Sequence, residues 1–412
     1  MLTFREHDFR PVILGGDITA YSLVRTFHEA YGVRPLVVNM TKSGPIALSR
    51  LCEHLYVEGL ENEETLVATL LEIGQTYGIE AGKKLLVIGC GDWYVRILVE
   101  NKQRLAEFFE IPYIDKELMD QIVLKDRFYA FLDELGIPYP ATFVYDVVAD
   151  TPLDFDFGWP VVAKPANSAL YHYAKFPGKK KVFICHSMDE LKGVLAGVRS
   201  SSYDYKFLIQ EFIPGADTNM RVLTCYSDTD AKVRFACVGH TLLEEHVPSA
   251  IGNPCAIITE PNAEIVRNAK KFLEHVGYTG FSNFDVKYDP RDGSYKFFEI
   301  NVRLGRSNYY VTASGYNVAP WMVRDLIRKE KMEGLVIANR EHLFTFVPKY
   351  VIKTFVSDDA MRGKALNLFK TGAWTDPQDY RPDLTPQRRV YNALYRANQI
   401  RKFHKYLGTR GA

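Results

Sequence analysis

Short apolar runs alternate with amphipathic stretches through the first third of the chain, and this alternation limits the fold more than any other feature. PVILGG (11–16) is a predicted strand that ends in a glycine turn, and ITAYSLVRTFHEAYG (18–32) is a predicted helix closed by Gly32. RPLVVNM (34–40) and KKLLVIGCG (83–91) are further strands of the same kind. Strands that alternate with helices favour a parallel sheet with crossover helices, so residues 1–120 are predicted to form an α/β unit.

The length and composition restrict the class of protein. A chain of 412 residues is long enough for two or three domains of the usual ~100–150 residues. The 47% hydrophobic and 25% charged residues are typical of a globular protein and exclude a disordered or fibrous one. With 51 Lys+Arg against 50 Asp+Glu the net charge is +1, which argues against a nucleic-acid partner held by overall charge. The six cysteines include no CxxC pair, so neither a zinc knuckle nor a disulfide scaffold is expected.

The location of the protein is predicted from what the sequence lacks. MLTFREHDFRPVIL carries charges where a signal peptide needs an apolar run. No stretch of the ~18 apolar residues needed to cross a bilayer occurs in the sequence. We therefore expect a cytoplasmic protein without a transmembrane segment.

The middle and the end of the chain are organised differently from the first third. WPVVAKPA (159–166) and YKFLIQEFIPG (205–215) are predicted strands, and the first contains a central lysine. The stretch between them at 166–180 combines glycine, small residues and lysines, as expected of a loop or hairpin that covers phosphate groups. Segment 331–412 begins with the strand-like HLFTFVPKYVIK and continues as basic, helical sequence. Beyond residue 380 one acid, Asp383, accompanies eight basic residues: Arg381, Arg388, Arg389, Arg396, Arg401, Lys402, Lys405 and Arg410.

The most informative segment is FSNFDVKYDPRDGSYKFFEINVRLGRSNYY (281–310). DPRDG is a turn sequence between two alternating runs, which predicts an antiparallel hairpin. Glu299 and Asn301 share one face of the second strand because side chains alternate with period two, and Asp285 can reach that face from the first strand. Two carboxylates and an amide oxygen are the hard ligands that Mg²⁺ prefers. The alternative is a structural network in which Asp285 and Glu299 pair with Arg303 or Lys287.

Two arginines follow this predicted metal site. Arg303 and Arg306 are separated by Gly305, which together with Ser307 allows a tight bend. The planar guanidinium group suits both phosphate and carboxylate oxygens. A metal site with adjacent arginines indicates phosphoryl transfer to a carboxylate.

These motifs resemble a known superfamily. The lysine of WPVVAKPA, the segment LIQEFIPGADT and the hairpin ending FFEINVR are similar to the ATP-grasp fold shared by D-alanine:D-alanine ligase, biotin carboxylase and carbamoyl-phosphate synthetase. EINVRLGRS resembles the E-x-N-x-R-x-x-R-S stretch of the last of these. Within the superfamily the chain most resembles the carboxylate–amine ligase group that includes D-aspartate ligase. The resemblance implies an α/β (α+β) protein with four parts: a Rossmann-like pre-ATP-grasp domain (1–124), a small lid subdomain (125–214), a large subdomain with the metal site (215–330) and a C-terminal extension (331–412).

The resemblance also implies the residue roles. ATP and Mg²⁺, usually two ions, are the expected cofactors, and Arg303 and Arg306 would stabilise charge on the transferring phosphoryl group. Asp285, Glu299 and Asn301 would hold the metal. Nucleotide binding would fall to Lys125, Lys164, Ser168, Lys175, Glu211, Phe212, Ile213 and Asp217, with His172 as a weaker member of the covering loop. For Lys125 a solvated position at a helix start is the alternative, and for Asp217 a capping role.

The implied reaction forms an amide bond. A carboxylate is activated as an acyl phosphate, and an amine then attacks it; the superfamily resemblance suggests D-aspartate or another amino acid joined to a cell-wall precursor amine. A dipeptide- or metabolite-forming ligase is the alternative. A nucleotide-dependent oxidoreductase and a non-catalytic nucleotide-binding protein are the rivals from other classes. The first is disfavoured because neither glycine turn completes the dinucleotide fingerprint GxGxxG, and the second because the metal set is intact.

The glycine turns and the basic C-terminus are each open to two interpretations. The glycine turns Gly15-Gly16-Asp17 and Gly89-Cys90-Gly91-Asp92 follow strands, where they either bind the carboxylate substrate or only shape the turn. The basic C-terminus is either a solvated helical face or a surface that attracts an anionic amine substrate, in which case charge reversal at Arg388, Arg389 and Arg396 would raise its KM. A homodimer is expected from the relatives.

Overall fold

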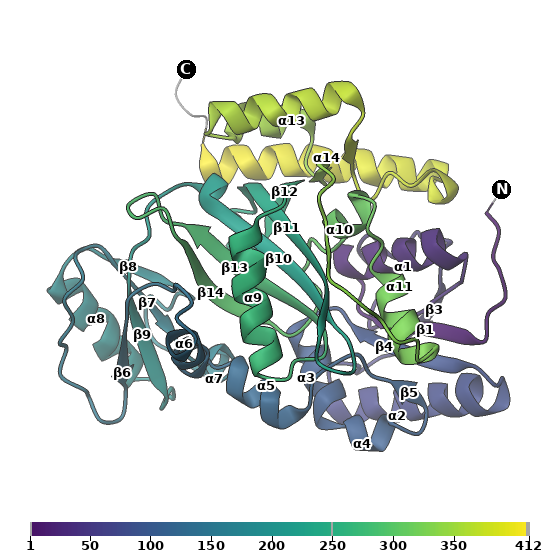
Figure 1. The fold of residues 1–412 in the computed structure, drawn as a ribbon, viewed down its shortest axis with the longest axis horizontal. Helices are drawn as coiled ribbons and strands as arrows, with labels where there is room; N and C mark the ends of the chain where they lie inside the picture. Colours follow the sequence, from purple (N-terminus) through teal and green to yellow (C-terminus); the bar gives the residue numbers. More distant parts are fainter. Residues whose placement is uncertain (1, 249, 409–412) are drawn as a thin grey trace. The chain divides into compact units, whose positions relative to one another are not determined.

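The computed structural model describes residues 2–248 and 250–408, which form two compact units (Figure 1). The first unit comprises Met1–Lys116, Ala216–Asn283 and Asn301–Ala412. The second comprises Glu117–Gly215 and Phe284–Ile300. Arg410 of the predicted basic extension lies outside the described residues.

The first unit begins with the predicted parallel sheet. Its five strands are parallel and follow the order β3-β2-β1-β4-β5, with Val12 of β1 beside Leu36 of β2 and Val87 of β4. β1, β2 and most of β4 are buried, which explains their continuous apolar sequences. The Rossmann-like prediction is therefore confirmed. The strands are β1 (Phe9–Leu14), β2 (Leu36–Asn39), β3 (Glu53–Tyr56), β4 (Lys84–Gly89) and β5 (Phe109–Glu110).

Helices connect these strands as the sequence predicts. Helix α1 (Ile18–Tyr31) starts at Asp17, whose carboxylate accepts the N–H groups of Thr19 and Ala20, and it ends at Gly32 in the left-handed conformation. Helix α3 (Asp92–Glu100) follows Gly91, whose φ of 146° is open to glycine alone. The other helices are α2 (Glu63–Ile73) with the π-helical turn η1 (Gly74–Glu80), α4 (Lys102–Leu105) and α5 (Lys116–Ile122).

A second, mostly antiparallel sheet has the order β14-β13-β10-β11-β12-β16-β17, with β15 paired to β11. Helix α9 (Ala263–His275) packs against β10 and β11, on the face visible in Figure 1. The predicted hairpin turn is confirmed, because Asp289 N–H donates to Ser294 O and Gly293 N–H to Asp289 O, both at 2.9 Å. The strands are β10 (Met220–Ser227), β11 (Val233–Glu244), β12 (Pro254–Thr259), β13 (Gly280–Tyr288), β14 (Tyr295–Asn301), β15 (Val336–Ile337), β16 (Leu343–Thr345) and β17 (Trp374–Thr375).

One hydrophobic core joins the beginning and the end of the chain inside the first unit. It extends from Phe9 through Phe235 to Phe403. The loop at 302–308 carries Arg303 and Arg306 and is called the arginine loop below. Helix α1 contacts the two short helices that follow this loop, α10 (Tyr309–Ala313) and α11 (Ala319–Met322). The turn η3 (Val323–Ile327) continues α11. The arginine loop is thus anchored on the core through the helices that follow it.

The C-terminal segment contains less strand than its sequence suggests. Of HLFTFVPKYVIK only Leu343–Thr345 is a strand, because Pro348 starts helix α12 (Lys349–Phe355). Helix α12 contacts both α13 (Asp359–Thr371) and α14 (Pro386–Leu407). Among the described residues no helix is both long and apolar enough to span a membrane.

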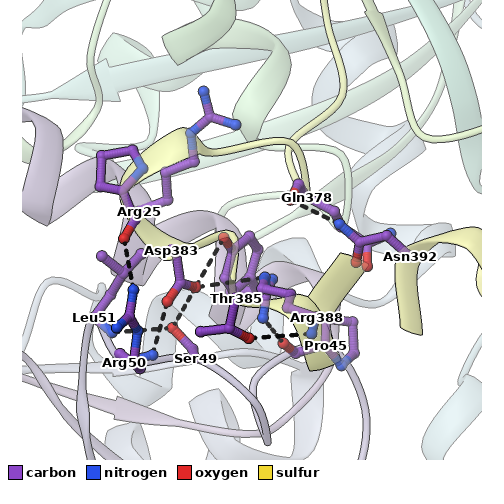
Figure 2. Close-up of polar contacts among 12 residues, drawn as sticks. Arg25, Pro45, Ser49, Arg50, Leu51, Gln378, Asp383, Thr385, Arg388 and Asn392 are labelled. Atoms are coloured by element: carbon purple, nitrogen blue, oxygen red, sulfur yellow. Dashed lines mark hydrogen bonds and ion pairs between the residues drawn. The ribbon is translucent and has the colours of Figure 1, made fainter. Parts of the chain in front are cut away.

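The basic extension is anchored in the first unit rather than exposed along its length (Figure 2). Arg388 and Asp383 are fully buried side chains 3.5 Å apart. Asp383 accepts hydrogen bonds from Tyr21 Oη, Ser49 Oγ and the Arg50 N–H, and Arg388 donates to Pro45 O. Arg396 pairs with Asp376 at 2.7 Å and Asp379 at 2.5 Å. The interpretation as a solvated face is wrong for Arg388, which is fully buried, whereas Arg396 is 33% exposed and paired with acids.

The second unit contains a smaller sheet of order β6-β9-β7-β8 around its own core. The predicted covering loop at 166–180 carries one short helix, α7 (Ser168–Tyr173), capped by the Asn167 side chain. Lys179 Nζ fastens the loop by donating to His172 O at 2.8 Å and Ala174 O at 2.7 Å. The other elements are α6 (Lys125–Glu134), β6 (Thr142–Asp146), β7 (Val161–Pro165), β8 (Phe183–Cys185), α8 (Met188–Arg199) and β9 (Lys206–Glu211).

Candidate active site

The centre of the site in the second unit is an ion pair between two residues that the sequence analysis selected. Lys125 Nζ lies 2.9 Å from Glu299 Oε2, and the lysine side chain is 13% exposed. Lys125 opens α6, where its N–H donates to Ala166 O at 3.3 Å, so it is not the solvated helix-start lysine of the alternative interpretation. The charge of Lys125 is the main cause that holds the pKa of Glu299 well below its usual range. Glu299 is therefore ionised at every physiological pH.

Lys164 lies beside this pair on β7. Its Nζ donates to Tyr129 Oη at 3.3 Å and lies 5.5 Å from the centre of the Phe298 ring. Burial, together with the charge of Lys125, lowers the pKa of Lys164 to about 7, although Glu299 and Asp285 act in the opposite direction. Lys164 is therefore only partly protonated at neutral pH, and an incoming phosphate group would favour its charged form.

The predicted metal ligands have the chemistry that Mg²⁺ requires. Glu299 and Asn301 lie two residues apart on β14 and so face the same side of the strand. Asp285 lies on the neighbouring β13, and both it and Glu299 act on Lys164. A carboxylate kept ionised by lysines offers the hard anionic oxygen that Mg²⁺ prefers. Among the described residues no three or more Asp, Glu, His or Cys side chains gather as a metal site, a pattern that a set of two carboxylates and one amide does not need.

The predicted adenine-binding segment is held by the hairpin. Arg291 in the turn pairs with Glu211 at 2.6 Å, and Lys287 Nζ donates to Ile213 O at 2.9 Å and Gly215 O at 3.2 Å. The Glu211 N–H donates to Ala141 O at 2.9 Å. Ile213 is buried and Phe212 half-buried, with Lys287 Nζ 5.7 Å from the centre of the Phe212 ring. Two backbone groups of the segment, the Glu211 N–H and the Ile213 C=O, therefore already have protein partners.

The remaining nucleotide-binding candidates lie at the surface or in turns. In the second unit Ser168, His172 and Lys175 are exposed on α7 and the loop that follows it. In the first unit Asp217 begins the 3₁₀ turn η2 (Asp217–Asn219), and its Oδ2 accepts the Glu244 N–H and a His246 Nε2 contact, both at 3.0 Å. The hydrogen bond to Asp217 raises the pKa of His246. Asp217 thus fastens the end of β11, and it does not cap its own turn, which has no side-chain cap.

Arg303 is bound to the second glycine turn within the first unit. Its Nε and one terminal nitrogen donate to the two carboxylate oxygens of Asp92 at 2.7 and 3.2 Å. The same side chain donates to Asn301 Oδ1 at 3.3 Å. Asp92 is the first residue of α3, directly after β4 and the turn at Gly89–Gly91. The predicted catalytic arginine therefore lies at the carboxyl end of a parallel strand, where α/β sheets bind ligands.

Arg306 occupies the matching position at the first glycine turn. One terminal nitrogen lies 3.2 Å from Glu245 Oε2, and the other lies 3.9 Å from Asp17 Oδ2. Asp17 follows β1 and caps α1. Each glycine turn thus places one carboxylate near one of the two arginines, Asp92 at Arg303 and Asp17 at Arg306.

Sequence reasoning missed several residues that take part in these contacts. In the second unit these are Lys181, whose charge also lowers the pKa of Glu299, and Tyr129, the partner of Lys164. In the first unit it is Glu245, which lies in the stretch 240–258 that was expected to shape the substrate pocket but was not singled out itself. The run of three lysines at 179–181 was a usable signal, whereas Tyr129 and Glu245 belong to ordinary amphipathic or acidic sequence and become visible only through the fold.

Comparison with known proteins agrees with this geometry. The family model "Carbamoyl-phosphate synthase L chain, ATP binding domain" matches residues 154–326. The L-amino acid ligase from Bacillus licheniformis matches with a TM-score of 0.55 at 15% identity, covering 78% of this chain and 75% of its own. Phosphoribosylamine–glycine ligase from Thermotoga maritima matches with a TM-score of 0.52 at 18% identity, covering 81% and 78%. These likenesses establish the class, an ATP-grasp fold.

A closer sequence relative defines the family. D-aspartate ligase from Enterococcus faecium (strain Aus0004) is 34% identical over 414 residues, which cover 98% of this chain and 98% of the relative. The chain therefore belongs to the ATP-grasp carboxylate–amine ligases, in the family that includes D-aspartate ligase. It is an ATP-dependent ligase that forms C–N bonds, and the superfamily binds ATP and Mg²⁺.

Proposed function

We propose that this enzyme joins the carboxylate of D-aspartate to an amine of a cell-wall precursor. The observation that carries this proposal is the likeness to D-aspartate ligase, which extends over nearly the full length of both chains. Dipeptide formation is the alternative. The fold is similar to that of an L-amino acid ligase, but this likeness bears on the fold alone and does not identify the substrates.

The division of the chain and the assembly belong to the same proposal. We assign 1–124 to the pre-ATP-grasp domain, 125–214 to the lid, 215–330 to the large subdomain and 331–412 to the extension. A cytoplasmic homodimer remains our prediction.

The residue roles that we assign rest on the charges of these side chains. ATP supplies the γ-phosphoryl group that activates the carboxylate, and Mg²⁺, in our proposal two ions held by Asp285, Glu299 and Asn301, offsets the charge of the phosphates. Lys125 and Lys164 bind phosphate oxygens, and a phosphate beside Lys164 restores its full protonation. Arg303 and Arg306 exchange their present carboxylate partners for oxygens of the transferring phosphoryl group and the acyl phosphate.

The other roles concern binding and exclusion of water. Glu211, Phe212 and Ile213 hold the adenine, Asp217 holds the ribose, and the α7 loop with Ser168 and Lys175 closes over the phosphates. Closure keeps water from hydrolysing the acyl phosphate. No nucleophilic side chain is needed, because the substrate carboxylate itself attacks the phosphoryl group.

Phosphate release under paired substrate conditions tests the proposal. The enzyme is incubated with ATP, Mg²⁺ and D-aspartate, with and without a nucleotide-linked cell-wall precursor peptide that has a free amine, and mass spectrometry identifies the product. We expect phosphate release and a product heavier by one aspartyl residue only when both substrates are present. L-aspartate serves as the matched control for the configuration of the carboxylate substrate. Equal activity with a pool of other amino acids, or none with D-aspartate, contradicts the proposed substrate.

A separate variant tests whether Glu299 binds the metal. Glu299→Ala removes a proposed ligand, and Glu264→Ala removes a carboxylate of α9 as a control. Loss of ATP-dependent phosphate release in the first variant alone supports the assignment. Unchanged phosphate release in Glu299→Ala would show that the metal is held elsewhere.

A further inference from the structure

Three carboxylates of the first unit lie against the two proposed catalytic arginines, and only one of them is buried. Asp92 is 76% exposed and gives both oxygens to Arg303. Asp17 is 44% exposed, and its oxygens already accept the Thr19 and Ala20 N–H groups and the Thr19 hydroxyl as the cap of α1. Glu245 is 3% exposed, and its Oε2 lies 3.2 Å from a terminal nitrogen of Arg306. Glu245 therefore differs from the other two in burial and in the number of groups that satisfy it.

The Glu245–Arg306 pair is incomplete on both sides. Within residues 2–248 and 250–408, Glu245 Oε2 receives no hydrogen bond, and Arg306 Nε donates none although it is buried. A buried carboxylate with an unsatisfied oxygen is costly unless a cation compensates its charge. If Arg306 turns to the acyl phosphate during the reaction, Glu245 loses its partner and needs another cation. The amine substrate arrives as an ammonium ion and is the cation that the reaction provides.

The elements around Glu245 leave its carboxylate able to accept a proton. Burial raises its pKa and Asp17 acts in the same direction, whereas Arg306 and Lys402 lower it, with a net upward shift. A carboxylate with a raised pKa is a stronger base than an ordinary glutamate. The titratable or charged groups that interact with Glu245 are Asp17 at the start of α1, Arg306 in the arginine loop, Cys255 on β12, and Tyr395 and Lys402 on α14.

We propose that Glu245 binds the ammonium group of the amine substrate beside Arg306 and takes one of its protons before the amine attacks the acyl phosphate. This inference rests on the proposed function and adds a catalytic residue to it. Glu245 follows directly on β11, whose last residue Glu244 is tied to Asp217, so the position of its backbone is fixed. A neutral amine is required because an ammonium ion has no lone pair to form the new bond.

The step balances in atoms and charge. The ammonium ion gives one proton to the Glu245 carboxylate and becomes an amine with a lone pair. That lone pair forms the N–C bond, and the C–O bond to the phosphoryl group breaks with its electron pair on the departing phosphate. The second proton of the nitrogen leaves with the phosphate, which gives a neutral amide and hydrogen phosphate.

Two nucleophiles that differ in protonation at neutral pH test whether Glu245 acts as a base or only as a structural residue. Glu245→Gln keeps the shape of the side chain and removes the base. Wild type and variant are given ATP, Mg²⁺ and D-aspartate with either the precursor peptide, whose amine is protonated at neutral pH, or hydroxylamine, which is neutral. Asp325→Asn is the control, since Asp325 is another buried carboxylate of the first unit with a pKa raised by burial, and it is engaged with Tyr226 and Thr229.

We expect amide formation by Glu245→Gln to fall by about 100-fold or more, the usual contribution of a general base, while hydroxamate formation stays close to wild type. Raising the pH should restore part of the amide rate, because more amine is then neutral in solution. Equal loss with both nucleophiles, or an unchanged amide rate, would overturn the proposal. Absence of hydroxamate from the wild-type enzyme would instead contradict D-aspartate as the carboxylate, and this result does not depend on Glu245.

Discussion

Two buried carboxylates of the first unit face arginines, and their surroundings differ. Asp383 is fully buried 3.5 Å from Arg388 and accepts three further hydrogen bonds, from Tyr21, Ser49 and the Arg50 N–H (Figure 2). Glu245 is 3.2 Å from Arg306, and among the described residues its Oε2 accepts no hydrogen bond. Both sites bury negative charge, and in both the arginine keeps buried N–H groups without a partner, but only the Asp383 carboxylate has hydrogen bonds to both of its oxygens.

This difference distinguishes a structural carboxylate, Asp383, from a carboxylate that can bind a ligand, Glu245. Hydrogen bonds that satisfy a buried charge fix the surrounding segments, and Asp383 joins three of them: α1, the loop after β2 and the C-terminal extension. A buried charge that lacks such partners is a poor structural element and a good binding element, because a ligand can supply what is missing. Glu245 and Arg306 are therefore suited to binding a ligand, whereas Asp383 and its partners are suited to holding segments of the chain together.

Removing the structural carboxylate should give the largest effect on stability. Asp383→Ala leaves Arg388 buried without its counter-charge, so we expect a loss of about 3–5 kcal/mol in the free energy of unfolding. Urea denaturation measures this loss. Asp379→Ala is the matched control, because Asp379 is 39% exposed beside Arg396 and such pairs contribute about 1 kcal/mol or less. Similar losses in the two variants would contradict the structural role of Asp383.

The arginine of the other pair should matter for rate more than for folding. Arg306→Ala is expected to lower D-aspartate-dependent ADP formation by about 10²–10³-fold, as for a lost donor to developing negative charge. The free energy of unfolding should also fall, but by less than in Asp383→Ala, because Glu245 loses its counter-charge and responds by binding a proton. Arg324→Ala serves as the control, because Arg324 is 44% exposed and pairs with Glu330. A folded Arg306→Ala enzyme with wild-type kinetics would show that the arginine takes no part in the reaction.

The sequence was sufficient for the features that local patterns determine. The parallel sheet follows from continuous apolar strands with glycine turns, and the hairpin follows from DPRDG between alternating runs. Glu299 and Asn301 share a strand face by their spacing alone. These features need only a few adjacent residues, so they can be predicted without knowledge of the fold.

Contacts between distant segments could not be predicted in this way. Lys125 meets Glu299 across more than 170 residues of sequence, and Arg388 meets Pro45 O across 343. The charge pattern of the extension even pointed in the wrong direction, because the acids that neutralise Arg396 lie on an earlier turn of the chain. Glu245 gives no signal in the sequence, since its importance comes from the arginine loop that the fold brings to it.

The pH dependence of stability should also distinguish Glu245 from Asp383, although the expected effect is smaller. The folded-state pKa of Glu245 is raised by burial, so the native state binds more protons than the unfolded state between the ordinary glutamate pKa of about 4.3 and the raised value. Stability contributed by this group therefore falls as pH rises through that window. Glu245→Gln removes the penalty, and we expect it to be more stable than wild type at pH 7.5, with a difference that shrinks toward pH 4. Thermal unfolding across this range measures it, and a destabilised variant at pH 7.5 would assign Glu245 to the same structural class as Asp383.

The smallest effect is expected on the outer face of the extension. Arg389 is exposed on α14, whereas Arg388 is buried and Arg396 is partly exposed beside two acids, so a single unpaired, exposed charge remains among the described ion pairs of the three arginines that were expected to attract an anionic substrate. One surface charge is screened by salt and contributes little to stability. Arg389→Glu should thus leave the free energy of unfolding within about 0.5 kcal/mol and the KM for the amine unchanged. Steady-state kinetics at low and high salt test this, and a KM for the amine that rises at low salt, with the KM for ATP constant, would restore electrostatic attraction as a function of the extension.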